Sequence, residues 1–169
     1  MAIRKIRKDP DPILRKISRR VDVFDWRLWQ LLDDMADTLR DSDGVGLAAV
    51  QVGVLRRIVI VDTGKEILEL INPEIISSSG MQEELEGCLS FPGHFGITHR
   101  PMIVKIKAQN RNGETYEYTG EGLIAKAFCH ETEHLDGKLF IDKCIKILSQ
   151  EELDDYIKKQ SNKKHQDKK

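Results

Sequence analysis

The sequence predicts an α+β domain in which helices are segregated from a mostly antiparallel sheet. Two patterns lead to this prediction. Apolar residues recur at helical spacing near both ends of the chain, whereas the middle consists of short β-branched or alternating runs bounded by turn residues. The 169 residues suffice for one domain with a substantial core, and no internal repeat or linker divides them.

The N-terminal part predicts turns followed by a long helix. "DPDPILRKISRRV" opens with two proline-limited turns and a short helix. In "FDWRLWQLLDDMADTLRDSDG", Asp25 is placed to cap the start of a helix and Gly44 lies just beyond its end. The apolar face of this helix consists of Leu28, Leu31, Leu32, Met35, Ala36 and Leu39.

The middle of the chain predicts strands. "RRIVIVD" and "EILELIN" are short runs of the strand type, and "MIVKIKAQNRNGETYEYTG" predicts a hairpin that turns at Asn112-Gly113. Apolar or aromatic residues alternate with polar ones along the two arms of this hairpin at Val104, Ile106, Ala108, Tyr116 and Tyr118.

Helical spacing returns toward the end of the chain. In "GLIAKAFCHETEHLDG", one helix face carries Leu123, Ala127, His130 and His134, and Gly137 is placed to end the helix. "SQEELDDYIKK" begins with a capping box in which Glu152 follows Ser149 by three residues. We therefore expect one domain over residues 1–160 and a disordered polar tail over residues 161–169.

Composition narrows the class of protein. Hydrophobic residues make up 40% and charged residues 33%, which is typical of a soluble globular domain. A net charge of −1 gives no electrostatic reason to expect sequence-specific nucleic-acid binding. The basic N-terminal stretch lacks the apolar run of a secretory signal, and no stretch is long enough to predict a membrane span. The lack of a secretory signal, together with three scattered cysteines, favours reduced thiols and a cytoplasmic location.

The sequence His-Glu-x-x-His predicts a metal site. His130 and His134 are four residues apart, so on a helix their side chains share one face and can occupy two corners of a tetrahedral site. Glu131 lies beside that edge, where it can act as a base toward metal-bound water. The alternative is an amphipathic helix with partly exposed histidines.

A third ligand would decide the class of metal protein. Metzincin peptidases have a further histidine at the position of Phe140, which cannot bind a metal. Thermolysin-like enzymes have a downstream helical carboxylate, and the candidates here are Glu151, Glu152 and Asp154. Upstream, "EGCLSFPG" offers Cys88 in a predicted loop, and a thiolate with two histidines leaves one position open for catalysis. Cys129 and Cys144 are interpreted as buried packing residues.

The segment "DSDGVGLAAVQVG" lets another backbone approach closely. Gly44-Val45-Gly46 leaves room for such an approach, and Gln51 presents an amide. The lysine and Ser/Thr of a phosphate-binding loop are missing, so on its own the segment is more typical of a helix-to-strand turn.

Three segments in order, "GVGLAAVQ", "EGCLS" and "HETEH", resemble the peptide deformylase family, and the resemblance covers roughly residues 3 to 148. It implies mostly antiparallel sheets packed around a central metal-binding helix, with an N-terminal and a C-terminal helix. Residues 1–160 would be a single catalytic domain. The implied reaction is removal of the N-formyl group from the formyl-methionine of new polypeptides, with release of formate.

The resemblance also implies roles for individual residues. Cys88, His130 and His134 would hold one divalent metal, usually Fe²⁺, which Zn²⁺, Ni²⁺ or Co²⁺ can replace. Glu131 would be the general acid/base for attack by metal-bound water on the formyl carbon. The amide of Gln51 and the backbone N–H of Leu89 would form the oxyanion hole.

The implied partner is a nascent formyl-methionyl polypeptide. It would pair like an added strand along Gly44-Val45-Gly46, and Glu86 and Gly87 would also bind it. The resemblance further suggests that the C-terminal helix contacts the ribosome transiently. The alternative for this basic segment is a solvated tail, and no membrane partner is expected.

Two residues depart from the family pattern. Cys129 stands where the family mostly has Gln, and Glu133 stands where it mostly has Asp. Glu133 is expected either to pair with a basic residue such as Arg100 or to be solvated. Phe95 is expected either to line the substrate cleft or to pack in the core.

Overall fold

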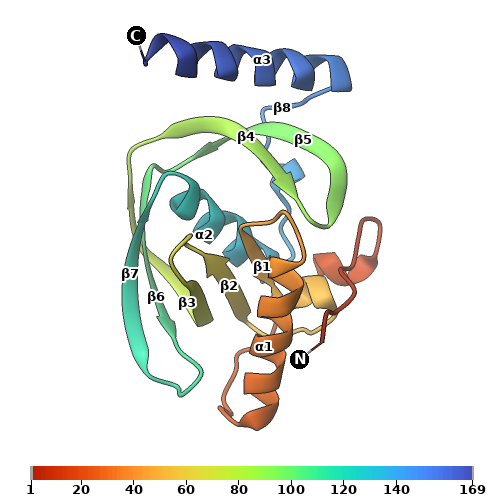
Figure 1. The fold of residues 1–169 in the computed structure, drawn as a ribbon. Helices are drawn as coiled ribbons and strands as arrows, with labels where there is room; N and C mark the ends of the chain where they lie inside the picture. The colour runs from red at the N-terminus through yellow and green to blue at the C-terminus, as the bar shows by residue number, and fades with distance from the viewer. Residues whose placement is uncertain (1, 169) are drawn as a thin grey trace.

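The computed structural model describes residues 2–168 and has the α+β architecture that the sequence predicts (Figure 1). Its α-helices are α1 (Trp26–Arg40), α2 (Leu123–His134) and α3 (Gln150–Gln166). Its strands are β1 (Gly46–Ala48), β2 (Ile58–Asp62), β3 (Ile67–Ser79), β4 (Gln82–Cys88), β5 (Phe91–Arg100), β6 (Ile103–Gln109), β7 (Thr115–Glu121) and β8 (Lys146–Ile147). Short 3-10 helices are η1 (Pro12–Arg15), η2 (Ala49–Val52) and η3 (Phe140–Asp142).

The strands form two antiparallel sheets. One has the order β1-β2-β3-β6-β7 and the other the order β4-β5-β8. Helix α2 lies in the middle of the molecule, between the larger sheet and the arch formed by β4 and β5 (Figure 1). This confirms the expected packing of antiparallel sheets around a central helix.

The larger sheet is buried on both faces along its strand β2. Alternate side chains of a strand point to opposite faces, so Val59 and Val61 pack toward α2, while Ile58 and Ile60 pack toward α1. The cluster on the α2 side includes Leu70, Val104, Ile106, Phe128 and Leu135. The cluster on the α1 side includes Leu28, Leu32, Met35, Leu39 and Ile71. The two cores fix α2 and β1 relative to each other.

The predicted start of α1 and the predicted end of α2 each have a local cause. The side chain of Asp25 accepts hydrogen bonds from the backbone N–H groups of Arg27 and Leu28, as its capping position predicts. After α2, Gly137 adopts a φ of +69°, which L-residues avoid. A Cβ at Gly137 would also lie 2.3 Å from the carbonyl oxygen of Arg15. Glycine is therefore required here for both its backbone angle and its size.

The hairpin of β4 and β5 differs from the sequence prediction of a loop around Cys88. Cys88 is the last residue of β4 and is paired with Phe91 of β5. The reason is that β4 is rich in charged residues and lacks apolar alternation, so its strand character comes from pairing with β5. The tight turn places Cys88 at a fixed point beside α2.

The C-terminal segment also differs from the prediction. Residues 161–169 were expected to be disordered, whereas α3 continues to Gln166; Lys169 lies outside the described residues. Ser149 caps the start of α3 by accepting a hydrogen bond from the N–H of Glu152. Basic residues in the last turn stabilise the helix through their interaction with its dipole. The single domain over residues 1–160 stays a prediction. In the described part of the chain, no helix is both long and apolar enough to cross a membrane.

Candidate metal centre and active site

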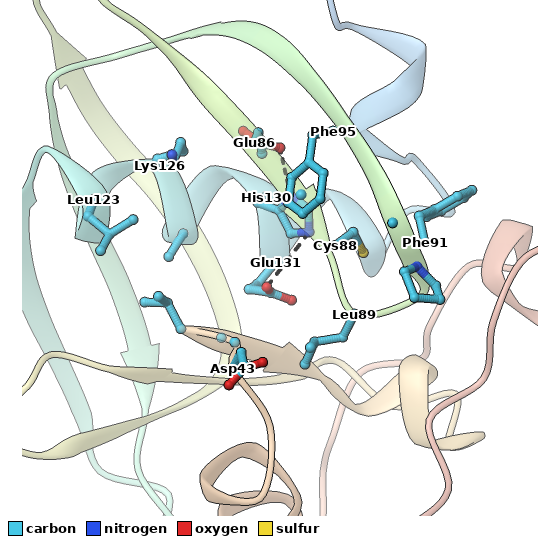
Figure 2. Close-up of a pocket in the computed structure, with 17 residues that line it drawn as sticks. Asp43, Glu86, Cys88, Leu89, Phe91, Phe95, Leu123, Lys126, His130 and Glu131 are labelled. Atoms are coloured by element: carbon cyan, nitrogen blue, oxygen red, sulfur yellow. Dashed lines mark hydrogen bonds and ion pairs between the residues drawn. The ribbon is translucent and has the colours of Figure 1, made fainter. Parts of the chain in front are cut away.

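A cavity of about 450 Å³ opens between β1, the β4–β5 hairpin and α2 (Figure 2). It brings together nearly all the site residues predicted from the sequence, although they come from three distant segments. Those that line it are Gly44, Val45, Gly46, Glu86, Gly87, Cys88, Leu89, His130 and Glu131. Figure 2 shows Cys88, His130 and Glu131 close together in the middle of this cleft.

Cys88, His130 and His134 form a candidate metal site. Their potential ligand atoms all lie within 4.8 Å of one another. Nε2 of His134 lies 3.4 Å from Sγ of Cys88 and 3.3 Å from Nε2 of His130. The end of β4 supplies the cysteine, and consecutive turns of α2 supply the histidines.

The donor chemistry of this site fits a divalent metal. Both imidazole Nε2 atoms and the sulfur converge on one point, and a cation there would satisfy all three lone pairs. The thiolate is a soft ligand and imidazole suits iron, zinc, nickel and cobalt alike. Cys88 is only half-buried and borders the cavity, so the approach to this point is open from one side.

Glu86 holds His130 in the orientation that a metal ligand requires. Its carboxylate lies 2.6 Å from Nδ1 of His130 and accepts hydrogen bonds from Thr98 and Arg100. Burial alone would raise the pKa of Glu86, but the hydrogen bonds from His130 and Arg100 hold it far below its usual value. The anion fixes the His130 proton on Nδ1, which leaves Nε2 free for metal.

The sequence prediction missed this contact. It placed Glu86 among the substrate-binding residues, and Glu86 does line the cavity. Its side chain, however, is engaged with His130 and Arg100. Nothing in the spacing of the motifs signals this contact, because it exists only once the hairpin folds over α2.

Glu131 is a buried carboxyl group at the edge of the cavity. Its Oε2 has no hydrogen-bond partner among the described residues, and burial raises the pKa of Glu131 to about 7. A Cβ on Gly46 would lie 2.7 Å from Cγ of Glu131, so only glycine leaves room for this side chain. A carboxyl group with a pKa near neutrality can both accept and donate a proton.

Gln51 is held with its amide nitrogen toward the hairpin. Its Oε1 accepts from the N–H of Ala48 at 2.9 Å, and its Nε2 donates to Ser90 at 3.1 Å. The same Nε2 lies 3.6 Å from Sγ of Cys88. A neutral donor therefore stands beside the candidate metal ligands. Leu89 lines the same cavity.

The downstream carboxylates do not join the metal site. Glu152 pairs with Lys146, and Asp154 accepts from Gln150 within α3. Among the described residues, the group able to hold a metal contains only Cys88 and the two histidines. The thermolysin-like alternative therefore has no support in the described part of the chain.

The residues that depart from the family pattern lie beside the candidate metal site. Cys129 is buried and is absent from the metal-binding group, as its packing interpretation predicts. Glu133 pairs with Arg100 at 2.7 Å, which confirms the first of its two predicted environments. Phe95 lines the cavity, and its ring covers Gly87, where a Cβ would lie 2.7 Å from Cε1 of the ring.

A Cys-His-His donor set beside a buried glutamate, in a cleft open to solvent, defines a metal-dependent hydrolase. The sequence profile described as Polypeptide deformylase matches residues 3–150. The chain belongs to the peptide deformylase family.

Individual relatives agree along most of the chain. A peptide deformylase of Alkaliphilus metalliredigens is 56% identical over 146 residues, which cover 86% of this chain and 99% of the relative. The crystal structure of a peptide deformylase from Legionella pneumophila has a TM-score of 0.82 and 44% identity, covering 95% of this chain and 98% of that one. The structure from Thermotoga maritima has a TM-score of 0.83 and 40% identity, covering 86% and 100%. The chain is thus a metal-dependent enzyme that removes the N-formyl group from newly synthesised polypeptides.

Proposed function

We propose that deformylation takes place at the centre formed by Cys88, His130 and His134, with Glu131 as the general acid/base. One observation carries this proposal. Three potential metal ligands lie within 4.8 Å of one another, next to a buried carboxyl group that borders the same cavity. These residues would hold one divalent metal per chain.

Fe²⁺ is the metal that we propose for this site. A thiolate gives more charge to the metal than a third imidazole would, which suits Fe²⁺, and Zn²⁺, Ni²⁺ or Co²⁺ fit the same donors. When bound, the metal supplies a nucleophilic water near neutral pH and a positive charge for the formyl oxygen.

The protein side chains then move the proton and stabilise the developing charge. Glu131 accepts a proton from the attacking water and delivers it to the leaving amine, a role open to a buried carboxyl group that borders the cavity. The Nε2 of Gln51 and the backbone N–H of Leu89 are the proposed neutral donors to the formyl oxygen as it gains charge. Formate and a free N-terminal amine result.

The polypeptide would bind between two strands that each end a sheet. Strand β1 is at the edge of the larger sheet and β4 at the edge of the smaller one. We propose that the substrate runs as an added strand along Gly44-Val45-Gly46, with Glu86 and Gly87 on the opposite wall. Since nascent chains are the substrate, we place the reaction in the cytoplasm.

A transient ribosome contact through α3 is the partner that we propose for the C-terminal segment. Helix α3 has no buried residue and ends in a run of basic side chains, as expected for a helix that meets an anionic surface. Co-sedimentation with ribosomes, with and without residues 158–169, tests this contact. Unchanged co-sedimentation would contradict it.

The decisive assay is formate release from N-formyl-methionyl peptides by anaerobically prepared protein loaded with Fe²⁺ or Ni²⁺. Glu131→Gln should retain the metal and lose most turnover, about 100-fold or more. Cys88→Ala should lose the metal, whereas a peptidase with a downstream carboxylate ligand would keep it. A loaded wild-type protein that releases no formate would overturn the proposal.

A further inference from the structure

Glu133 lies between two cations on the side of α2 that bears Arg100. Its Oε1 accepts from Nη1 of Arg100 and from Nζ of Lys143, each at 2.7 Å. Its Oε2 is buried and has no hydrogen-bond partner among the described residues. The Glu133 side chain is 13% exposed, and its interaction with Arg100 is correspondingly shielded from solvent.

Arg100 connects Glu133 to the metal centre. The Arg100 side chain is 4% exposed, and its three nitrogens divide between two carboxylates. Nη1 donates to Glu133, while Nε and Nη2 donate to Glu86. Because Glu86 accepts from His130, an unbroken chain of charged hydrogen bonds runs from Lys143 at the surface to a candidate metal ligand.

We propose that Glu133 is a positioning residue of the metal centre, which sets, through Arg100 and Glu86, how strongly His130 binds the metal. The inference rests on the metal site proposed above. It assigns a role to the position at which this chain has Glu rather than the usual Asp.

The physical reason is that two carboxylates share the positive charge of Arg100. With Glu133 ionised, the Arg100 guanidinium is shared by two carboxylates, and Glu86 keeps enough negative charge to accept strongly from His130. If Glu133 were neutral, Arg100 would be paired with Glu86 alone. Glu86 would then be a weaker acceptor, the His130 imidazole less basic, and the metal held less tightly.

Lys143 acts in the opposite direction. Its side chain is 55% exposed, and its ammonium group competes with Arg100 for the carboxylate of Glu133. Removing the lysine leaves Glu133 to Arg100 alone. Metal affinity should then stay the same or rise. General damage to the packing would instead weaken metal binding whichever partner were removed.

The experiment compares metal binding in wild-type protein, Glu133→Gln, Glu133→Asp and Lys143→Met, with Co²⁺ as the probe. Readouts are the Kd for Co²⁺, the thiolate-to-Co²⁺ absorption band, and the separate values of kcat and KM for a formyl-methionyl peptide. Asp34→Asn is the matched control, since it breaks another ion pair with a buried carboxylate, to Arg4, on the α1 side of the larger sheet.

We expect Glu133→Gln to weaken Co²⁺ binding about tenfold, to shift the absorption band and to lower kcat with KM unchanged. Glu133→Asp, which keeps the charge, should restore the wild-type spectrum. Lys143→Met should bind Co²⁺ at least as tightly as wild type. Asp34→Asn should lose stability but keep the wild-type Kd and spectrum.

Two results would overturn the inference: wild-type Kd and spectrum in Glu133→Gln, or weakened binding in Lys143→Met. The second needs no change to a buried atom, so it decides the matter even if Glu133→Gln does not fold. Failure of the metal site itself is distinguishable, because wild-type protein would then show no thiolate band with Co²⁺.

Discussion

The single hydrogen atom that serves as the side chain of Gly46 makes room for Glu131. An added Cβ would lie 2.7 Å from Cγ of Glu131 and 3.0 Å from its Oε1, closer than ordinary van der Waals contact. Gly46→Ala should therefore displace the carboxyl group while leaving the metal ligands in place. Since a misplacement of about 1 Å can cost about 100-fold in rate, we expect kcat to fall by that order.

Formate release by protein with measured metal content tests this expectation. Gly96→Ala is the matched control: its Cβ would lie 3.0 Å from the Cβ of Cys144 and from the carbonyl oxygen of Lys146, which are not predicted site residues. It should lose stability and keep its kcat. Equal losses of kcat in the two variants would contradict the role given to Gly46.

Asp34 is a second residue whose contacts predict a measurable effect. Burial would raise its pKa, but hydrogen bonds from the N–H of Ala2 and the side chain of Arg4 hold the pKa of Asp34 below its usual value. The folded state therefore binds this proton less readily than the unfolded state. The stabilisation is present above the ordinary pKa of Asp, about 3.9, and is lost as pH falls through the lower folded value.

Asp34→Asn should accordingly lower the free energy of unfolding by about 1.5 to 3 kcal/mol at pH 7. The difference from wild type should shrink as pH falls below about 3.9. Urea unfolding of both metal-free proteins at several pH values measures it. A difference that grew in acid would show that the sign is wrong.

At this scale the sequence predicted the two candidate histidine ligands because their spacing is local, whereas Cys88 was assigned as the third ligand only through the resemblance to the family. Two histidines four residues apart share a helix face whatever the rest of the fold does. The contact of Glu86 with His130 was not predictable in this way. It joins residues on different elements and depends on how the β4–β5 hairpin packs over α2.

Among the elements, the end of α2 depends on glycine at position 137. Gly137 combines a φ of +69° with the approach of the Arg15 carbonyl oxygen. We expect Gly137→Ala to destabilise the protein by more than about 2 kcal/mol, since the backbone angle alone costs 1 to 2 kcal/mol. Thermal or urea unfolding measures the loss.

Gly64 offers a control with the same backbone strain. Its φ is +86°, but nothing lies within 4 Å of a Cβ placed there. Gly64→Ala should cost only the strain of the backbone angle. If the two alanine variants were equally stable, the contact with Arg15 would not matter.

The elements also show where sequence patterns succeed. Helix α1 and the β6–β7 hairpin were predictable because one face of each is buried in the core, which imposes apolar periodicity. Strand β4 lies at a sheet edge and carries glutamates on much of its length, so no such periodicity marks it. Helix α3 was predicted at its capped start but not at its end, because no buried face limits its length.

For the whole molecule, the proposed metal site would link the two sheets. Cys88 belongs to the smaller sheet, whereas the histidines belong to the helix packed on the larger one. A metal that binds only the folded protein should therefore stabilise the folded state. The stabilisation is about 2.7 kcal/mol when the free metal concentration is 100 times the Kd. Removal of the metal by a chelator should lower the Tm, as measured by calorimetry.

Cys88→Ala provides the control for this prediction, because it removes the ligand that belongs to the smaller sheet. Its Tm should respond little to added metal or to chelator. If wild-type protein kept the same Tm after verified metal removal, the metal would not link the two sheets energetically.

The half-buried position of Cys88 at the wall of the cavity also bears on the lifetime of the enzyme. If the polypeptide enters through this opening, as we propose, dioxygen and peroxide can enter too, and a thiolate oxidised to sulfinic acid does not return to the thiol by simple reduction. A polypeptide lying along Gly44-Val45-Gly46 would cover the sulfur. We therefore expect the enzyme to survive air longer while it is saturated with substrate or product than while it is idle.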